Sequence, residues 1–374
     1  KALKELMPPR QRNPFRIISG TSAGAINSVV LASKAQRFGF AVDELERVWG
    51  GFRTDMVYKS DALTMLKSSG HWLAALVFGG LGVANPRSLL DNAPLRALLS
   101  RNVRFPRIQN NIERGFLDAV AVTAAGYSSA RSVTFFQACE NALEWRRTRR
   151  VGRKLALNLD HLMASIAVPM IFPPVAIGGE FFGDGAMRQA TPLSPAVHLG
   201  ADRILVIGVR DERAGHVGTS DAAPEFPGFG QIAGYVLDTL FLDGLYSDLE
   251  RLARINRLIE NIAPSARHGM ARDMRTIETM VVLPSVDLRE VALQYVKELP
   301  TPVRMLLGGV GGGEGRLLSF LLFESGFTRA LIDQGYRDAM AMSDELLAFV
   351  SGEDVVSLSG PESVVDDLSG IYRV

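Results

Sequence analysis

Residues 15–30 read FRIISGTSAGAINSVV, an apolar run that stops at a glycine and resumes as a stretch with small residues. The segment "RIIS" is typical of a short strand, and "AGAINSVVLAS" is typical of the start of a helix. Between the two lies the pattern Gly-x-Ser-x-Gly, which is formed by Gly20, Thr21, Ser22, Ala23 and Gly24. A serine at a strand-to-helix turn of this kind is a candidate nucleophile, and the alternative is a small residue in a tight turn.

The physical requirements of such an elbow favour the interpretation of Ser22 as a nucleophile over that of a small residue in a tight turn. We expect side chains at Gly20 or Gly24 to collide with the adjacent strand and helix. The turn places Ser22 at a helix N-terminus, where free backbone N–H groups and the positive end of the dipole stabilise an alkoxide or an oxyanion. Thr21 and Ala23 would then shape the elbow, with the Ala23 amide donating to the oxyanion.

A nucleophilic serine needs a base, and histidine is the usual partner. The chain has five histidines: His71, His161, His198, His216 and His268. None stands in a sequence context that suggests a triad, and each fits a surface or core histidine. His216, in a glycine-containing loop, and His198 stay open as alternative bases.

A carboxylate is the stronger candidate for the base. The segment "VAIGGEFF" predicts a hairpin that turns at Gly178 and Gly179, and it leads into "GDGA", formed by Gly183, Asp184, Gly185 and Ala186. The two glycines around Asp184 allow close backbone approach. A free aspartate with a pKa of about 3.9 is a poor base, so this role requires burial or precise placement of the carboxylate. The alternative is an ordinary Asp-Gly turn.

Together with "MASIAVPMIFPPV" at residues 163–175, these motifs resemble the patatin-like phospholipase family over residues 13–210. The resemblance implies a three-layer α/β/α fold with a mainly parallel central sheet, which hydrolyses acyl esters of phospholipids or related lipids. It also implies a serine–aspartate dyad, in which Ser22 attacks the ester carbonyl and Asp184 takes the serine proton and later activates water. No metal and no other cofactor is implied.

One departure from the family pattern concerns the oxyanion hole. The family has a glycine-rich loop shortly before the elbow strand, but the residues before "NPFRIISG" are "KALKELMPPRQR", without a glycine. Since Lys1 is not a start methionine, we expect the first strand and this loop to lie upstream. Because of this departure, a lipid-binding protein with impaired catalysis remains an alternative function.

A second glycine-rich segment is "GGVGGGEGR" at 308–316. Its backbone N–H groups could cradle an anion, although a hinge or lid is the favoured interpretation of this segment.

Strands and helices alternate along the chain, which predicts an α/β class with helices over a mainly parallel sheet. The predicted strands are Phe15–Ser19, Leu117–Thr123, Ser132–Phe136, Val175–Phe182, Arg203–Val209 and Ile277–Leu283. The predicted helices are Ala23–Ser33, Ser88–Leu99, Phe229–Ile262, Leu288–Lys297 and Arg329–Val350. We expect a catalytic core at 1–210, a remainder of the same domain with a candidate lid at 211–350, and an acidic tail at 351–374.

Charge and composition restrict the partners. The net charge of +1, from 41 basic and 40 acidic residues, gives no overall field for nucleic acid. A single cysteine excludes an intrachain disulfide and fits a reducing compartment, so we expect a cytoplasmic protein with peripheral membrane contact. The basic run "WRRTRRVGRK" at 145–154 is either a solvated face or a site for anionic headgroups, through Arg146, Arg147, Arg149 and Arg150.

Two apolar windows are too short to span a bilayer. They are "HWLAALVFGGLGVA" at 71–84 and "LLSFLLF" at 317–323. Both predict core helices or a lid, and the alternative is docking on a lipid surface, since Trp72 and Phe78 suit a membrane interface.

Overall fold

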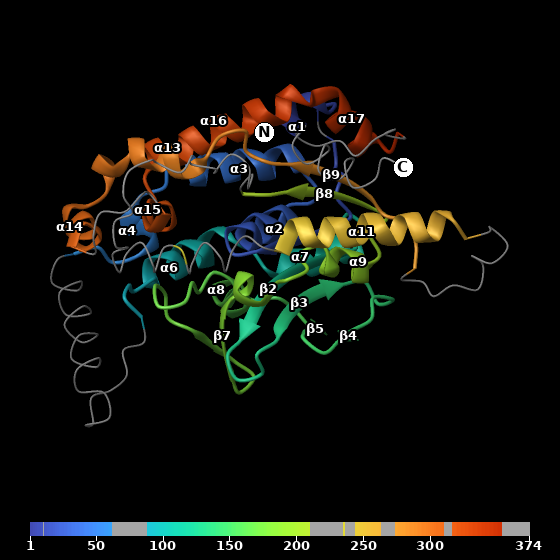
Figure 1. The fold of residues 1–374 in the computed structure, drawn as a ribbon, viewed down its shortest axis with the longest axis horizontal. Helices are drawn as coiled ribbons and strands as arrows, with labels where there is room; N and C mark the ends of the chain where they lie inside the picture. The colour runs from blue at the N-terminus through green and yellow to red at the C-terminus, as the bar shows by residue number, and fades with distance from the viewer. Residues whose placement is uncertain are drawn as a thin grey trace, which may run out of the picture.

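The computed structural model describes residues 1–9, 11–61, 88–209, 235, 244–262, 274–309 and 316–353. Within these residues a seven-stranded sheet and a two-stranded sheet lie among helices (Figure 1). The strand order in the larger sheet is β4–β5–β3–β2–β7–β6, and β1 pairs with β2 off this path. Its strands are β1 (Ile17–Thr21), β2 (Ala119–Gly126), β3 (Ser132–Ala138), β4 (Trp145–Arg146), β5 (Arg150–Lys154), β6 (Val175–Ile177) and β7 (Glu180–Asp184).

The pairing in this sheet is mixed. β1 runs parallel to β2 and β3 runs parallel to β5, whereas β2 is antiparallel to both β3 and β7. The hairpins β4–β5 and β6–β7 are antiparallel as well. The α/β class is thus confirmed, but the expectation of a mainly parallel sheet is wrong for these strands. The physical reason is that short turns such as Gly178–Gly179 can join only antiparallel neighbours.

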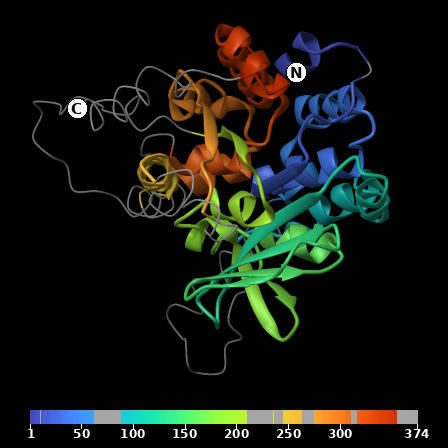
Figure 2. The same ribbon diagram turned by 90° about the vertical axis from the view of Figure 1, so that its right-hand side faces the viewer.

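The two faces of β2 carry different halves of the core, because successive side chains of a strand point to opposite sides. Val120 and Val122 belong to the main core cluster, which also takes in residues of α2, α7 and α8. Ala119 and Ala121 pack on the other face with Trp145 and, from α9, Leu199. The bounds of these helices are α2 (Ala23–Ser33), α7 (Pro106–Glu113), α8 (Leu159–Ser165) and α9 (Ser194–Leu199). Helices therefore cover both faces, as Figure 2 shows from the side.

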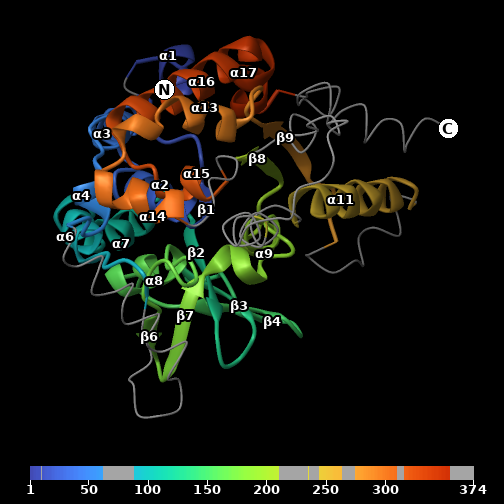
Figure 3. The ribbon, with the colours of Figure 1, turned by 60° about the vertical axis from the view of Figure 1, so that its left-hand side comes forward.

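The smaller sheet consists of the parallel strands β8 (Arg203–Ile207) and β9 (Glu278–Val282). Ile204 and Val281 pack with Leu249 of α11 (Gly244–Glu260). Leu205 and Met280 face the opposite way, toward α1 (Ala2–Leu6) and α17 (Ser343–Ser351). This sheet is therefore also covered on both faces, and it lies on the side of β1 away from β2 (Figure 3).

The remaining helices form the outer layer of the described chain. They are α3 (Phe38–Gly50), α4 (Thr54–Val57), α6 (Ala93–Asn102), α13 (Leu288–Gln294), α14 (Thr301–Gly309), α15 (Arg316–Leu321) and α16 (Ser325–Ala341), with 3-10 turns η1 (Gly185–Arg188) and η3 (Val296–Glu298). Leu318, Leu321 and Leu322 are buried, so "LLSFLLF" contributes to the core as predicted. None of the described helices is long and apolar enough to cross a bilayer.

Most predicted elements are present with shifted ends. α2 has the predicted bounds, whereas α6 begins at Ala93 rather than Ser88, because Pro94 suits the first turn of a helix. The stretch predicted as one helix over 329–350 is two helices, α16 and α17, that meet at Met342. The window at 71–84, the glycine-rich residues 310–315 and the tail from 354 lie outside the described residues, as does the helix predicted over 229–262 apart from Tyr235 and residues 244–262.

Candidate active site

The nucleophile elbow predicted from the sequence is formed by the end of β1 and the start of α2. Ser22 lies between Thr21 and Ala23 with φ 54° and ψ −127°, a backbone conformation that residues other than glycine rarely adopt. A Cβ atom at Gly20 would lie 2.2 Å from the carbonyl oxygen of Gly24 and 2.4 Å from Ser28 Oγ. Gly20 therefore has to be glycine, as predicted.

Gly24 is different. A Cβ atom there would meet nothing within 4 Å. The expectation that a side chain at Gly24 collides with its surroundings is wrong, because this position of α2 faces open space in the cavity that Ser22 also lines.

Asp184 reaches the elbow through the arrangement of strands along β2. β3 occupies one edge of β2, and β1 and β7 share the other edge, end to end. Thr21 is the last residue of β1 and lies opposite Thr123; Asp184 is the last residue of β7 and lies opposite Ala124. Since Thr123 and Ala124 are consecutive, the ends of β1 and β7 meet, which brings Asp184 next to Ser22.

The glycines around Asp184 allow the close approach that their positions suggested. A Cβ atom at Gly185 would lie 2.3 Å from the carbonyl oxygen of Thr123, and one at Gly183 would lie 2.9 Å from the hydroxyl of Tyr127. Asp184 is fully buried, which is one of the two conditions that the role of a base requires. Ala186 donates its N–H to Asp184 Oδ1 at 3.0 Å, while Oδ2 has no hydrogen-bond partner among the described residues.

Burial raises the pKa of Asp184 from its ordinary value of 3.8 to about 7. The Ser22 hydroxyl and the Ala186 N–H act in the opposite direction, because hydrogen bonds to the carboxylate favour the charged form. Ser22 is near enough to Asp184 to stabilise its charge but forms no aligned hydrogen bond with Oδ2, a geometry common in sites without substrate. Burial and the Asp184 charge together raise the pKa of the neighbouring Tyr127. The carboxyl group thus has the proton affinity of a base suited to neutral pH.

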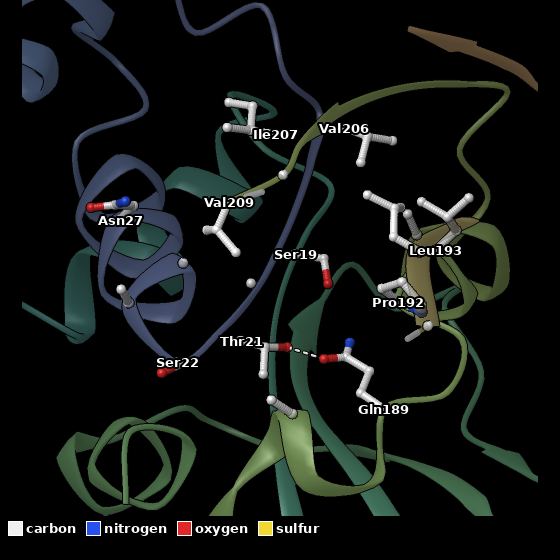
Figure 4. A pocket seen from close by; sticks show the side chains of 18 of the residues that line it. Ser19, Thr21, Ser22, Asn27, Gln189, Pro192, Leu193, Val206, Ile207 and Val209 are labelled. Carbon is white, nitrogen blue, oxygen red and sulfur yellow. Dashed lines mark hydrogen bonds between the residues drawn. The ribbon is translucent and has the colours of Figure 1, made fainter. Parts of the chain in front are cut away.

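Two polar residues that the sequence did not single out connect the elbow to its surroundings. The Thr21 hydroxyl donates to Gln189 Oε1 at 2.5 Å (Figure 4). The Ser165 hydroxyl accepts the N–H of Ser22 at 3.1 Å. Gln189 follows the "GDGA" motif closely, and Ser165 lies within "ASIAVP", but a polar residue near a motif does not by itself reveal its partner.

The described histidines have contacts of their own. His161 Nδ1 accepts the N–H of Asn158 at 3.1 Å, its ring lies 4.6 Å from that of Phe135, and burial lowers its pKa. His198 Nδ1 lies 2.8 Å from the carbonyl oxygen of Ser194, and its ring stacks on Trp145. His216 lies outside the described residues.

A cavity of about 2230 Å³ opens beside Ser22. Part of its lining is apolar, and Phe52, Val57, Leu95, Phe172 and Phe323 are among the residues there. It also extends to β8 and the residues after it, where Ile207 and Val209 are 76% and 68% exposed (Figure 4). The cavity thus offers a hydrophobic surface for a substrate, and strands β1 and β8 both line it.

The basic run forms the hairpin β4–β5 at the edge of the sheet, a pairing that the sequence analysis did not predict. Arg146, Arg147 and Arg149 are exposed and Arg150 is half-buried, and all four are among the lining residues of the cavity. The Arg150 guanidinium donates to Thr191 Oγ1 at 2.5 Å. Four cationic side chains therefore line the same cavity as Ser22.

No group of histidine, cysteine, aspartate and glutamate residues in the described part of the chain could hold a metal ion. The groups described above can still supply a nucleophile, a base and an apolar surface. A serine at a strand-to-helix elbow, next to a buried carboxylate in an α/β/α fold, defines a class of protein with the site of an acyl hydrolase.

The family model for patatin-like phospholipase matches residues 1–197, more than half of the chain, so the chain belongs to the patatin-like phospholipase family. Members of this family act on lipids, and the chain is accordingly a lipid acyl hydrolase in its broad class. No curated protein matches the chain.

Proposed function

We propose that the protein hydrolyses carboxylic ester bonds of phospholipids or related lipids with Ser22 as nucleophile and Asp184 as base. The observation that carries this proposal is the buried carboxylate beside the elbow serine, with Oδ2 unpartnered among the described residues and a pKa of about 7. At neutral pH such a carboxylate is partly ionised and can take up the serine proton. The apolar cavity wall, with Phe52 and Phe172, provides a surface for an acyl chain.

The reaction proceeds through an acyl-enzyme. As Ser22 Oγ attacks the ester carbonyl carbon, its proton passes to Asp184, and the carbonyl oxygen becomes an oxyanion. The tetrahedral intermediate collapses when Asp184 returns the proton to the leaving alcohol. Water then gives a proton to Asp184 and attacks the acyl-enzyme, and the free acid leaves as the proton returns to Ser22.

The test compares the wild type with Ser22→Ala and Asp184→Asn on short-chain acyl esters and on phospholipid vesicles. We expect both variants to lose nearly all hydrolysis, since each lacks one member of the pair. Hydrolysis at the wild-type rate in both would refute the dyad. His198→Ala and His216→Ala are the matched controls, because a serine–histidine enzyme would fail in one of them while a dyad enzyme keeps most of its activity.

The oxyanion needs N–H donors, and α2 offers one. Ala23 is exposed at the first position of α2 and lines the cavity, and amides in a first helical turn have no acceptor within the helix. The Ser22 N–H is bound to Ser165. We therefore propose the Ala23 amide as one donor and a loop preceding Lys1 as the source of another.

The sheet edges support an additional strand leading into that loop. Among the described residues β1 pairs only with β2 and β8 pairs only with β9, and the free edges of β1 and β8 line the same cavity. Unpaired edges with exposed apolar side chains such as Ile207 accept a further strand readily. Such a strand could run in either direction along β1. Its last residue would lie near Ser22 in one direction and near the opposite end of β1 in the other. Only the first direction would place the loop after the strand at the oxyanion.

A rate comparison tests this proposal. A longer form that carries residues before Lys1 should hydrolyse esters about 10² to 10³ times faster than residues 1–374 alone, the usual contribution of one oxyanion donor. Equal rates in the two forms would contradict it. A longer form that binds vesicles but hydrolyses nothing would instead favour a lipid-binding protein with impaired catalysis.

We also propose contact with anionic lipid surfaces through Arg146, Arg147, Arg149 and Arg150. These arginines line the same cavity as Ser22, which supports this proposal, because a membrane held there would lie next to the cavity that contains the serine. Each arginine near an anionic surface contributes roughly 1 kcal/mol, enough together to recruit the protein without inserting it.

A further inference from the structure

The elbow has a conformational cost that other contacts must offset. Ser22 adopts φ 54° and ψ −127°, and a residue held in such a sparsely populated region costs about 1 to 3 kcal/mol. The pairing of Thr21 with Thr123 fixes the chain before Ser22, and α2 fixes the chain after it. The peptide group between Thr21 and Ser22 lies between these two constraints, and its orientation depends on the hydrogen-bond partner of the Ser22 N–H.

Ser165 is that partner. It is the last residue of α8 and its side chain is fully buried. Its hydroxyl accepts the Ser22 N–H at 3.1 Å and donates to the carbonyl oxygen of Thr123 at 2.7 Å. One hydroxyl thus connects the nucleophile's backbone to the β2 residue that lies opposite Thr21.

The same segment also holds the base. Two residues after Ser165, the carbonyl oxygen of Ala167 accepts the N–H of Asp184 at 2.8 Å. The Thr123 carbonyl that Ser165 binds is also the atom closest to a Cβ built on Gly185, so it lies against the residue after the base. Residues 165–167 therefore contact the backbones of both Ser22 and Asp184 from one short stretch of chain.

We propose that Ser165 is a positioning residue, whose hydroxyl sets the direction of the Ser22 side chain relative to Asp184. The inference rests on the proposed function, because it concerns the geometry of that nucleophile and base. Ser165 contacts the backbone of Ser22 and no reacting atom. Its loss should leave substrate binding intact and misplace the nucleophile.

Ser165→Ala tests this in the full chain. We expect kcat on a short-chain ester to fall by about 10- to 100-fold with KM unchanged, the size of effect that a displacement near 1 Å produces. The midpoint of the pH–rate profile should also move upward, since Ser22 lowers the pKa of Asp184 and a displaced hydroxyl does so less. Tyr127 is the other titratable group that interacts with Asp184, and it is unchanged in this variant.

Ser33→Ala is the matched control. Ser33 is buried on α2, and its hydroxyl donates to the carbonyl oxygen of Val30 at 2.9 Å, so its removal also deletes a buried hydrogen bond. We expect a comparable loss of thermal stability with wild-type kcat and pH midpoint. If Ser165→Ala matches Ser33→Ala in all three measurements, Ser165 is merely structural and the proposal fails.

Two further variants keep the outcome clear. Should Ser165→Ala not fold, Ser165→Cys retains the side-chain volume and weakens both hydrogen bonds, so kcat should still fall; wild-type kcat would overturn the proposal. A parallel measurement of Ser22→Ala distinguishes failure of the proposed function from failure of the positioning role of Ser165. If it is as active as the wild type, the proposed function itself fails, whereas an inactive Ser22→Ala with fully active Ser165 variants rejects the positioning role alone.

Discussion

At the scale of the residue, Asp184 shows how burial can give a carboxyl group the proton affinity that the proposed base requires. Its carboxyl group is fully buried at the end of β7 and accepts one hydrogen bond, from Ala186 N–H. Desolvation disfavours the charged carboxylate more than this hydrogen bond and Ser22 favour it, so the pKa rises to about 7. A buried aspartate thereby acquires a proton affinity close to that of histidine.

The pH dependence of hydrolysis follows from this pKa. Only the ionised carboxylate can accept the Ser22 proton, so kcat/KM should rise with pH, reach half of its plateau near pH 7 and level off at higher pH. Initial rates on a soluble short-chain ester between pH 5 and 9 measure the midpoint. A profile already flat from pH 5 upward would mean that the base has the pKa of an ordinary aspartate.

Stability should depend on pH in the opposite direction. The ordinary pKa of 3.8 applies to Asp184 in the unfolded chain, whereas its pKa in the folded protein is about 7. Between these two pH values the folded chain therefore binds more protons than the unfolded chain. The free energy of unfolding therefore falls as the pH rises through this window, by about 4 kcal/mol at most. Asp184→Asn should melt above the wild type at pH 8 and near it at pH 4. A variant that melts below the wild type at pH 8 would contradict the assignment.

The two elbow glycines should respond differently to alanine. Gly20→Ala forces a methyl group to within 2.2 Å of the Gly24 carbonyl oxygen, and overpacking of this kind costs about 1 to 3 kcal/mol or prevents the elbow from forming. Gly24→Ala places its methyl group in open space and improves helix propensity by about 0.5 to 1 kcal/mol. Thermal unfolding and ester hydrolysis of both variants check this. Equal destabilisation would show that the cavity at Gly24 is closed.

At the scale of the element, the hairpin β4–β5 gives the basic run a fixed place. Its arginines hide the strand signal, because only Trp145 and Gly152 of the two strands are buried, with the indole ring 2.4 Å from where a Cβ atom on Gly152 would lie. The elements with clear apolar patterns, such as α2 and the β6–β7 hairpin, were predictable from local sequence. The hairpin β4–β5 was not, since its pairing depends on β3 beside it.

Membrane recruitment should depend on the exposed arginines of this hairpin. Replacing Arg146, Arg147 and Arg149 with glutamine should weaken binding to anionic vesicles by roughly 1 kcal/mol per residue, and added salt should weaken wild-type binding likewise. Arg150 is kept, because it donates to Thr191. A variant with glutamine at the exposed Arg101, Arg104 and Arg107 is the control of equal charge. Equal vesicle flotation of the two variants would reject the hairpin as the contact.

At the scale of the whole molecule, the site depends on strands that are far apart in the sequence. The motifs around Ser22 and Asp184 could be recognised separately, and the family resemblance joined them. Their contact, however, results from β1 and β7 sharing one edge of β2, and no local pattern specifies that register. For the same reason Ser165 and Gln189 could not be assigned from sequence, because their partners are set by tertiary packing.

The edges of β1 and β8 that have no partner strand in the described part of the chain give a prediction for hydrogen exchange. In a longer form of the chain, the proposed additional strand would pair with both edges, so peptides covering β1 and β8 should exchange their amide hydrogens more slowly than in residues 1–374. Peptides from β2 and β3, which are paired already, are the internal control. Unchanged exchange in β1 and β8 would place any upstream segment elsewhere.

The shared edge of β2 also has a consequence for the order of folding. β2 and β3 are close neighbours in the chain and can form their hairpin early, whereas Ile17 must close a long loop to reach Ala119. β7 reaches the same edge only after a further long connection. Ser22 and Asp184, the proposed nucleophile and base, are therefore brought together late, so a partly folded chain already has much of its sheet before the proposed site can form.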